Sequence, residues 1–218
     1  MILLLSIVHG YPEWFWRMPV KEGAYFAVGY APSSPYLSSA VEYAVKQAKI
    51  ELCREMGFEV KAEGGVVATP YGDAWIEGRF EEIVDTTRKF NFYVLDTAIT
   101  ENMVLVLVGT VKDIPSLFSP PDNWWKEAPQ GEYAVGVAPA YYYEMSSWLE
   151  AEKTARKNLA QFIHCEIQTL TKGREEVFEE VKREKTAVSI RSYQVLARRR
   201  EGTLFYVLIK GSGIGVSH

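Results

Sequence analysis

The fold is decided by two stretches of sequence, Ala27-Val28-Gly29-Tyr30-Ala31-Pro32 and Ala134-Val135-Gly136-Val137-Ala138-Pro139. They agree at five of six positions, at a spacing of 107 residues. The same spacing brings Ala44 onto Ala151 and Ala48 onto Ala155. Agreement that persists at one fixed spacing is typical of an internal repeat. The sequence therefore predicts a tandem duplication.

Each stretch is expected to be a buried strand followed by an amphipathic helix. A glycine inside an apolar run predicts close backbone approach at Gly29 and Gly136. A serine followed three residues later by a glutamate predicts a capping box at each helix start, at Ser39 and Ser147. The apolar residues of the two helices recur every three or four positions. They are Val41, Ala44, Val45, Ala48, Leu52 and Met56, and Trp148, Ala151, Ala155, Leu159, Phe162 and Ile163.

The helices are predicted to end at Gly57 and at the aligned His164, because both residue types tolerate left-handed backbone. Apolar spacing then predicts strands at 59–63 and 166–171, a short second helix at 80–87, and hairpins of 92–100 with 103–111 and of 189–197 with 203–210. The predicted fold class is α+β: two tandem homologous modules, each a mainly antiparallel sheet with one long helix and a short second helix on one face.

The chain is predicted to divide into four segments. Residues 1–10 form an apolar leader, which fits either a signal peptide cleaved after Gly10 or a buried first strand. The first module covers residues 11–112 and the second covers residues 122–218. Between them, residues 113–121 form a linker whose prolines disfavour helix and central strand.

Composition and charge limit the classes of function. With 48% hydrophobic and 24% charged residues, the chain is expected to be ordered and globular. A net charge of -4 argues against nucleic acid as a partner. Cys53 and Cys165 are too few for a disulfide scaffold. No apolar run approaches the ~20 residues of a transmembrane helix, so membrane association is expected to be peripheral at most.

A search for catalytic patterns finds none. The three histidines show no metal-ligand spacing, and no nucleophile motif is present. We therefore expect no catalytic residues, no metal site, no cofactor and no enzymatic activity. The paired Glu81 and Glu82 are expected on a solvated helix face, and the arginine run at 198–200 in an exposed hairpin turn. The glycine-rich tail at 211–215 is expected to be frayed.

Aromatic residues near the first strand of each module are the best candidates for a binding site. They serve either to pack the edge of the core or to form a recognition surface, since Trp and Tyr are common at binding hot spots and also stack on sugars. The candidates are Trp14, Trp16, Trp124, Trp125, Tyr141 and Tyr142.

The order of these motifs resembles the LPP-twenty-like lipoprotein family of bacterial envelopes, and flagellar accessory proteins of the FlgP and FlgT kind look similar. The resemblance covers nearly all of the chain, once per module, through Trp14 and Trp124 and the two strand and helix motifs quoted above. It implies a non-enzymatic envelope or surface protein. The family often carries a lipidated cysteine after its signal, and neither Cys53 nor Cys165 can be that residue.

Two functions follow from these observations. The first is a non-catalytic envelope protein, exported to the periplasm or cell surface, whose repeated modules bind protein partners or further copies of the chain and could serve a surface structure or flagellum. The second is a carbohydrate- or peptidoglycan-binding module that uses the Trp and Tyr clusters. Quenching of Trp fluorescence by glycan fragments would separate the two.

Overall fold

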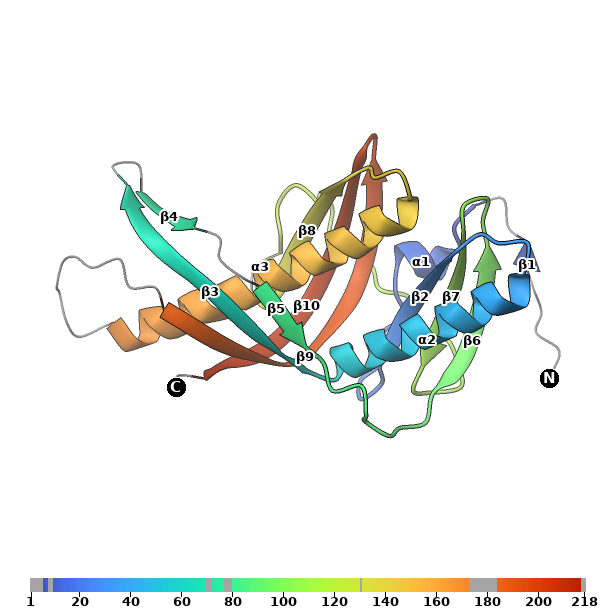
Figure 1. The fold of residues 1–218 in the computed structure, drawn as a ribbon, viewed down its shortest axis with the longest axis horizontal. Helices are drawn as coiled ribbons and strands as arrows, with labels where there is room; N and C mark the ends of the chain where they lie inside the picture. The colour runs from blue at the N-terminus through green and yellow to red at the C-terminus, as the bar shows by residue number, and fades with distance from the viewer. Residues whose placement is uncertain are drawn as a thin grey trace.

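The computed structural model describes residues 6–7, 10–69, 72–76, 80–129, 131–172 and 184–216. These residues form an α+β fold in which two long helices cover two sheets (Figure 1). The elements are β1 (Ser6–Ile7), α1 (Glu13–Trp16), β2 (Phe26–Pro32), α2 (Leu37–Glu55), β3 (Phe58–Thr69), β4 (Gly72–Ile76), β5 (Phe80–Ile83), β6 (Tyr93–Ile99), β7 (Met103–Gly109), β8 (Tyr133–Pro139), α3 (Glu144–Lys172), β9 (Glu184–Glu201) and β10 (Leu204–Val216).

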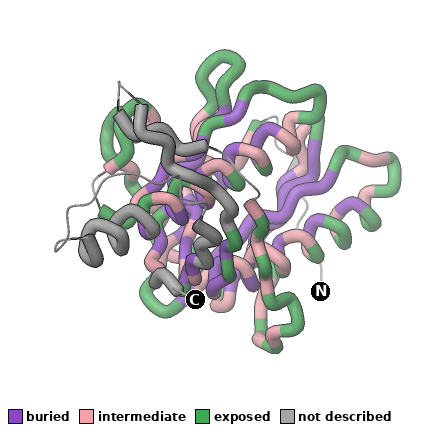
Figure 2. Tube along the Cα trace, turned by 60° about the vertical axis from the view of Figure 1, so that its left-hand side comes forward, coloured by how far each residue is buried: buried purple, intermediate pink, exposed green. Residues whose placement is uncertain are grey.

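The first sheet has the strand order β1-β6-β7-β2. The hairpin of β6 and β7 is antiparallel, β2 pairs antiparallel with β7, and β1 adds in parallel to β6. One face of β2 and β7 packs against α2 through alanines and valines. The other face contributes Val28, Tyr30 and Leu107 to a core shared with the second half of the chain. Buried residues accordingly run along the strands in the middle of the molecule (Figure 2).

The second sheet has the order β4-β3-β9-β10-β8, with β5 beside β3. The arrangement of β2, α2, β6 and β7 recurs in the second half as β8, α3, β9 and β10. In each case the first strand pairs with the second strand of the hairpin. A common origin of the two arrangements stays a prediction. Strand β3 comes from the first half but pairs with β9, from Phe58 opposite Ile190 to Gly64 opposite Glu184. The two halves are therefore interlocked by a shared sheet.

The predicted close approach at the two glycines is confirmed. A Cβ atom on Gly29 would overlap the carbonyl oxygen of Ala44, and one on Gly136 would overlap that of Ala151. Each helix therefore lies directly on its strand, with small residues on both sides of the contact.

The helix ends follow the prediction only in the first half. Helix α2 ends at Glu55 and Gly57 has φ 120°, as expected for a C-terminal cap. Helix α3 does not end at His164 and residues 166–171 are not a strand, because the helix continues to Lys172. The physical reason is that no glycine or proline interrupts the sequence between the start of α3 and residue 173.

Both predicted capping boxes are wrong. Helix α2 begins at Leu37, before Ser39, and its N-cap residue Tyr36 makes no side-chain cap bond. Helix α3 begins at Glu144, before Ser147. The Ser147 hydroxyl instead accepts a hydrogen bond from the backbone N–H of Tyr141 at 2.8 Å, which closes the loop that precedes the helix.

The predicted short helix at 80–87 is also wrong, because Phe80–Ile83 form strand β5 against β3. The corresponding short helix predicted for the second module lies outside the described residues. The last hairpin is longer than predicted, so the arginine run lies inside β9 and the glycine-rich tail continues β10. This pairing needs glycine at positions 211 and 213, because a Cβ on either would collide with a side chain of α3 and the backbone of β9.

The predicted linker holds the N-terminal segment in place. Phe118 donates its backbone N–H to the Met18 carbonyl at 2.9 Å, and Met18 in turn donates to the Leu196 carbonyl of β9 at 2.9 Å. Trp124 then packs against Leu196 and Leu208 on the sheet face opposite α3.

The glycine contact is open to a direct test. Gly29→Ala is expected to lower the free energy of unfolding by at least about 2 kcal/mol, because the added methyl overlaps backbone that cannot rotate away. Urea unfolding followed by circular dichroism measures the change. Ser39→Ala, at an exposed position of α2, is the control, and it should change stability by less than about 1 kcal/mol. Equal stability of the two variants would contradict the tight helix contact.

Candidate functional site

Four of the six predicted binding residues pack into the structure. Trp14 and Trp124 are buried, and the Trp14 indole donates a 2.7 Å hydrogen bond to Asp96. Trp16 is half-buried and packs edge-on against Trp148, with ring centroids 5.8 Å apart. Trp125 is half-buried beneath the Arg199 guanidinium, which lies 3.5 Å from its ring centre. The tryptophans thus join segments of the chain together.

The other two candidates, together with the next residue, form the most exposed aromatic cluster in the described part of the chain. Tyr141, Tyr142 and Tyr143 are 48%, 93% and 64% exposed. They line a cleft of about 540 Å³, called here the tyrosine cleft. Its other lining residues are Pro32, Ser33, Glu101 and Asn102 from the first half, and Ala140, Glu144, Met145, Arg200 and Phe205 from the second. The cleft therefore exists only where the two halves meet.

The polar groups of the tyrosine cleft are held in position. Arg200 donates to Glu144 at 3.0 Å and to the Gly202 carbonyl at 3.3 Å, and its guanidinium lies 5.0 Å from the Phe205 ring centre. The Asn102 amide is 3.5 Å from the second oxygen of Glu144. Asn102 and Glu144 come from different halves, so this contact connects them. Tyr11 interacts with Glu144, and burial raises the pKa of Tyr11 well above its usual value, so this hydroxyl stays protonated.

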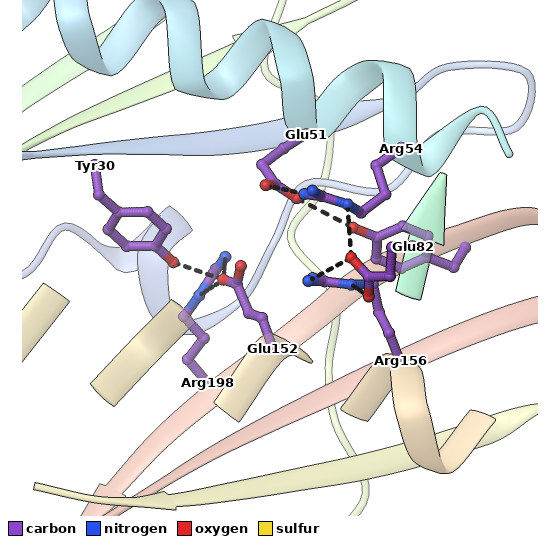
Figure 3. A network of polar contacts seen from close by, with 8 residues as sticks. Tyr30, Glu51, Arg54, Glu82, Glu152, Arg156 and Arg198 are labelled. Atoms are coloured by element: carbon purple, nitrogen blue, oxygen red, sulfur yellow. Dashed lines mark hydrogen bonds and ion pairs between the residues drawn. The ribbon is translucent and has the colours of Figure 1, made fainter. Parts of the chain in front are cut away.

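A second group of polar residues is buried where the halves pack together (Figure 3). Glu152 of α3 lies between Tyr30 of β2 and Arg198 of β9. The Tyr30 hydroxyl donates to Glu152 Oε1 at 2.6 Å, and Arg198 Nη2 donates to the same oxygen at 2.8 Å. Arg198 Nη1 donates to the Phe15 carbonyl at 3.1 Å. Burial raises the pKa of Tyr30, which keeps the hydroxyl protonated as a donor.

A second cluster of buried ion pairs lies beside the group around Glu152 (Figure 3). Glu82 of β5 accepts from Arg156 of α3 at 2.7 Å and lies 3.2 Å from Arg54 of α2. Arg54 also pairs with Glu51, which accepts from the Tyr193 hydroxyl at 3.2 Å. Burial alone would raise the pKa of Glu51, but the charges of Arg54 and Arg156 outweigh it and hold the pKa below its usual value.

Glu55 lies near both clusters and is 1% exposed. Burial, and then the charge of Glu51, raise its pKa well above the usual 4.5. A protonated Glu55 leaves three charged carboxylates, Glu51, Glu82 and Glu152, facing the three arginines of the clusters. The buried charges then balance, as the cost of burying an unpaired charge requires. Glu51, Arg54, Glu55, Glu82, Glu152, Arg156, Arg198, Tyr30 and Tyr193 are called the buried network below.

Sequence reasoning missed this network and misplaced two of its members. Arg198 was expected in an exposed turn but is 4% exposed in a strand, and Glu82 was expected on a solvated helix face but pairs with two arginines. One signal could have pointed to it. Glu152 and Arg156 follow directly after Ala151 and Ala155, so they lie beside the alanine stripe that covers the sheet.

The chemistry open to these groups is limited by access. The charged members of the buried network are paired and shielded from solvent, which suits a structural role. Burial raises the pKa of the Cys53 thiol and disfavours its reactive thiolate. Among the described residues, no group of three or more His, Cys, Asp or Glu could hold a metal ion. In the same residues, no helix is both long and apolar enough to cross a membrane.

Comparison with protein-family models, curated proteins and solved structures finds no match to this chain. The tyrosine cleft and the buried network are therefore the structural features that bear on the function of the chain.

Substituting Glu55 separates its protonation from its packing. Because folding raises the pKa of Glu55 above its usual value of 4.5, the wild-type protein loses stability as the pH rises beyond that value. The loss is up to about 1.4 kcal/mol per pH unit. Glu55→Gln carries no ionisable proton, so its stability relative to wild type should rise as the pH increases from about 5. Urea unfolding across this range measures the difference. Glu81→Gln, on the exposed face of β5, is the control, and a pH-independent difference for Glu55→Gln would refute a neutral Glu55.

The pair of Glu152 and Arg198 is tested by a double-mutant cycle. Arg198→Met leaves a buried carboxylate without its cation and should cost about 3–5 kcal/mol in unfolding free energy. Adding Glu152→Gln removes that charge while its amide oxygen still accepts from Tyr30, and should recover about half of the loss. Lys21→Met, which breaks the exposed 3.6 Å pair with Asp113, should cost less than about 1 kcal/mol. Simple additivity of the two buried substitutions would show that the pair is not coupled.

Proposed function

We propose that the chain is a non-catalytic interaction protein of the cell envelope and that the tyrosine cleft is its binding surface. The observation that carries the proposal is the exposure of three consecutive tyrosines at a cleft built by loops of both halves. Tyr142 is 93% exposed, so its ring contributes almost no packing to the fold of the isolated chain. Tyrosines are enriched at the centre of binding surfaces because they bury a large area at low entropic cost.

The rest of the structure supports binding over turnover. The groups with strongly displaced pKa values do not line the tyrosine cleft, because Glu55 and Tyr30 are buried in the interior and Tyr11 lies behind Glu144. Tyr30 hydrogen-bonds Glu152, and Glu82 pairs with Arg156, so these buried contacts hold one half against the other and preserve the shape of the cleft. An apolar N-terminal run and the resemblance to envelope lipoproteins favour an exported chain with partners at the cell surface.

Site-specific photo-crosslinking in the expressing cells tests both parts of the proposal. Tyr142→p-benzoylphenylalanine is expected to yield a crosslinked product in the envelope fraction, whereas Tyr43→p-benzoylphenylalanine is expected to yield none. Tyr43 is a suitable control because it is a 48% exposed tyrosine on α2 that does not line the tyrosine cleft. Fractionation and intact mass of the same chain establish its compartment and its N-terminus, expected at Tyr11.

Two outcomes would overturn the proposal. An intact Met1 in the cytoplasm would contradict the envelope location. Equal crosslinking from positions 142 and 43, or none from either, would show that the tyrosine cleft is not a binding surface. Mass spectrometry of the product identifies the partner as another protein, a second copy of the chain or a glycan.

A further inference from the structure

We infer that the ligand of the tyrosine cleft is a saccharide without acidic groups. This inference rests on the proposed function, because it names the ligand class of the same surface. It depends on three properties of the lining: aromatic faces open to solvent, hydrogen-bonding groups of both kinds, and a nearly balanced charge. Each property is carried by described residues.

The first property is an aromatic wall beside a closed floor. The Tyr142 and Tyr143 rings are perpendicular, with centroids 4.9 Å apart, so they present surfaces in two directions. Phe205, which is 1% exposed, forms part of the apolar lining. A pyranose ring has an apolar C–H face that packs on such aromatic surfaces. A volume of about 540 Å³ is within the usual range of roughly 300–1,000 Å³ for small-ligand sites.

The second property is the mixture of donors and acceptors. Arg200 offers only donors, Glu101 and Glu144 offer acceptors, and Asn102 and Ser33 offer both. Arg200 uses Nε and Nη1 internally, and in the described part of the chain its Nη2 makes no hydrogen bond. A sugar hydroxyl both donates and accepts, so neighbouring hydroxyls match this mixed lining. An anion or a cation would need partners of one kind only.

The third property is the charge of the lining. Arg200 is neutralised by Glu144 at 3.0 Å, which leaves Glu101 as the one carboxylate of the lining without a described ion pair. A single exposed carboxylate attracts a cation only weakly in water and disfavours an acidic sugar. The tyrosine cleft therefore suits a neutral polar ligand better than a basic peptide.

The polar lining is also fixed before a ligand arrives. Glu144 lies in the first turn of α3 and accepts from both Arg200 of β9 and the Asn102 amide of the β6–β7 turn. A ligand then loses less free energy to the ordering of side chains. Neutral saccharides gain little from charge, so they depend on such prearranged groups.

The test is a titration of the full-length, ¹⁵N-labelled protein with three neutral trisaccharides: the N-acetylglucosamine trimer, cellotriose and maltotriose. At least one is expected to shift the backbone amide signals of Asn102 and of residues 141–143 saturably, with a Kd of about 1 mM or tighter. Tyr142→Ala should weaken that Kd at least about tenfold, whereas Tyr142→Phe, which keeps the ring, should change it by less than about twofold. Tyr43→Ala is the matched control and should leave it unchanged.

Three results would overturn the inference. They are the absence of a saturable shift with every trisaccharide, equal binding by Tyr142→Ala, or saturable binding of trilysine in place of the sugars. The crosslinking experiment separates this failure from that of the proposed function. A crosslink from position 142 to a protein, without saccharide binding, would retain the surface and reject the ligand class. The absence of any crosslink from position 142 would reject the surface itself.

Discussion

The close contact between helix and strand at Gly29 and Gly136 is the constraint on which the rest of the structure depends. With no side chain on either glycine, the backbone of α2 and of α3 lies directly on a strand through Ala44 and Ala151. Any larger residue at these positions would lift the helix from its sheet. The distance between each helix and its sheet determines which groups the side chains of that helix can contact. These side chains include glutamates and arginines of the buried network.

The buried network in turn depends on strands of the first half that join the sheet of the second half. Strand β3 leaves the first half to pair with β9, and β5 follows it, which brings Glu82 beside Arg54 and Arg156. An ion pair buried in this way is a costly arrangement unless every charge is compensated. Compensation is close here because burial favours the neutral form of Glu55 while the other three carboxylates pair with arginine. Such a network favours one relative position of the two halves over nearby alternatives.

Local patterns predicted the parts of the fold that depend on local physics. The strand at Gly29, the helix end at Gly57 and both hairpins followed from steric rules that act within a few residues. The extent of α3 was missed because a short alternating pattern fits strand and helix alike, and tertiary packing decides between them. The pairing of β3 with β9, and of Glu152 with Arg198, joins positions far apart in the chain, so no local pattern marks it. Among the aromatic candidates, composition could not separate buried Trp14 from exposed Tyr142.

Strand β9 connects the buried network to the tyrosine cleft. Arg198 and Arg200 lie two residues apart, opposite Val207 and Phe205 of β10, so both project from the face that α3 covers. One arginine fixes Glu152 in the interior and the other fixes Glu144 at the cleft, and both glutamates belong to α3. A shift of α3 along the sheet would therefore disturb both pairs together. The loops that carry Ser33 and Asn102 belong to the other half of the chain, so the shape of the cleft depends on the buried contacts that hold the halves in register.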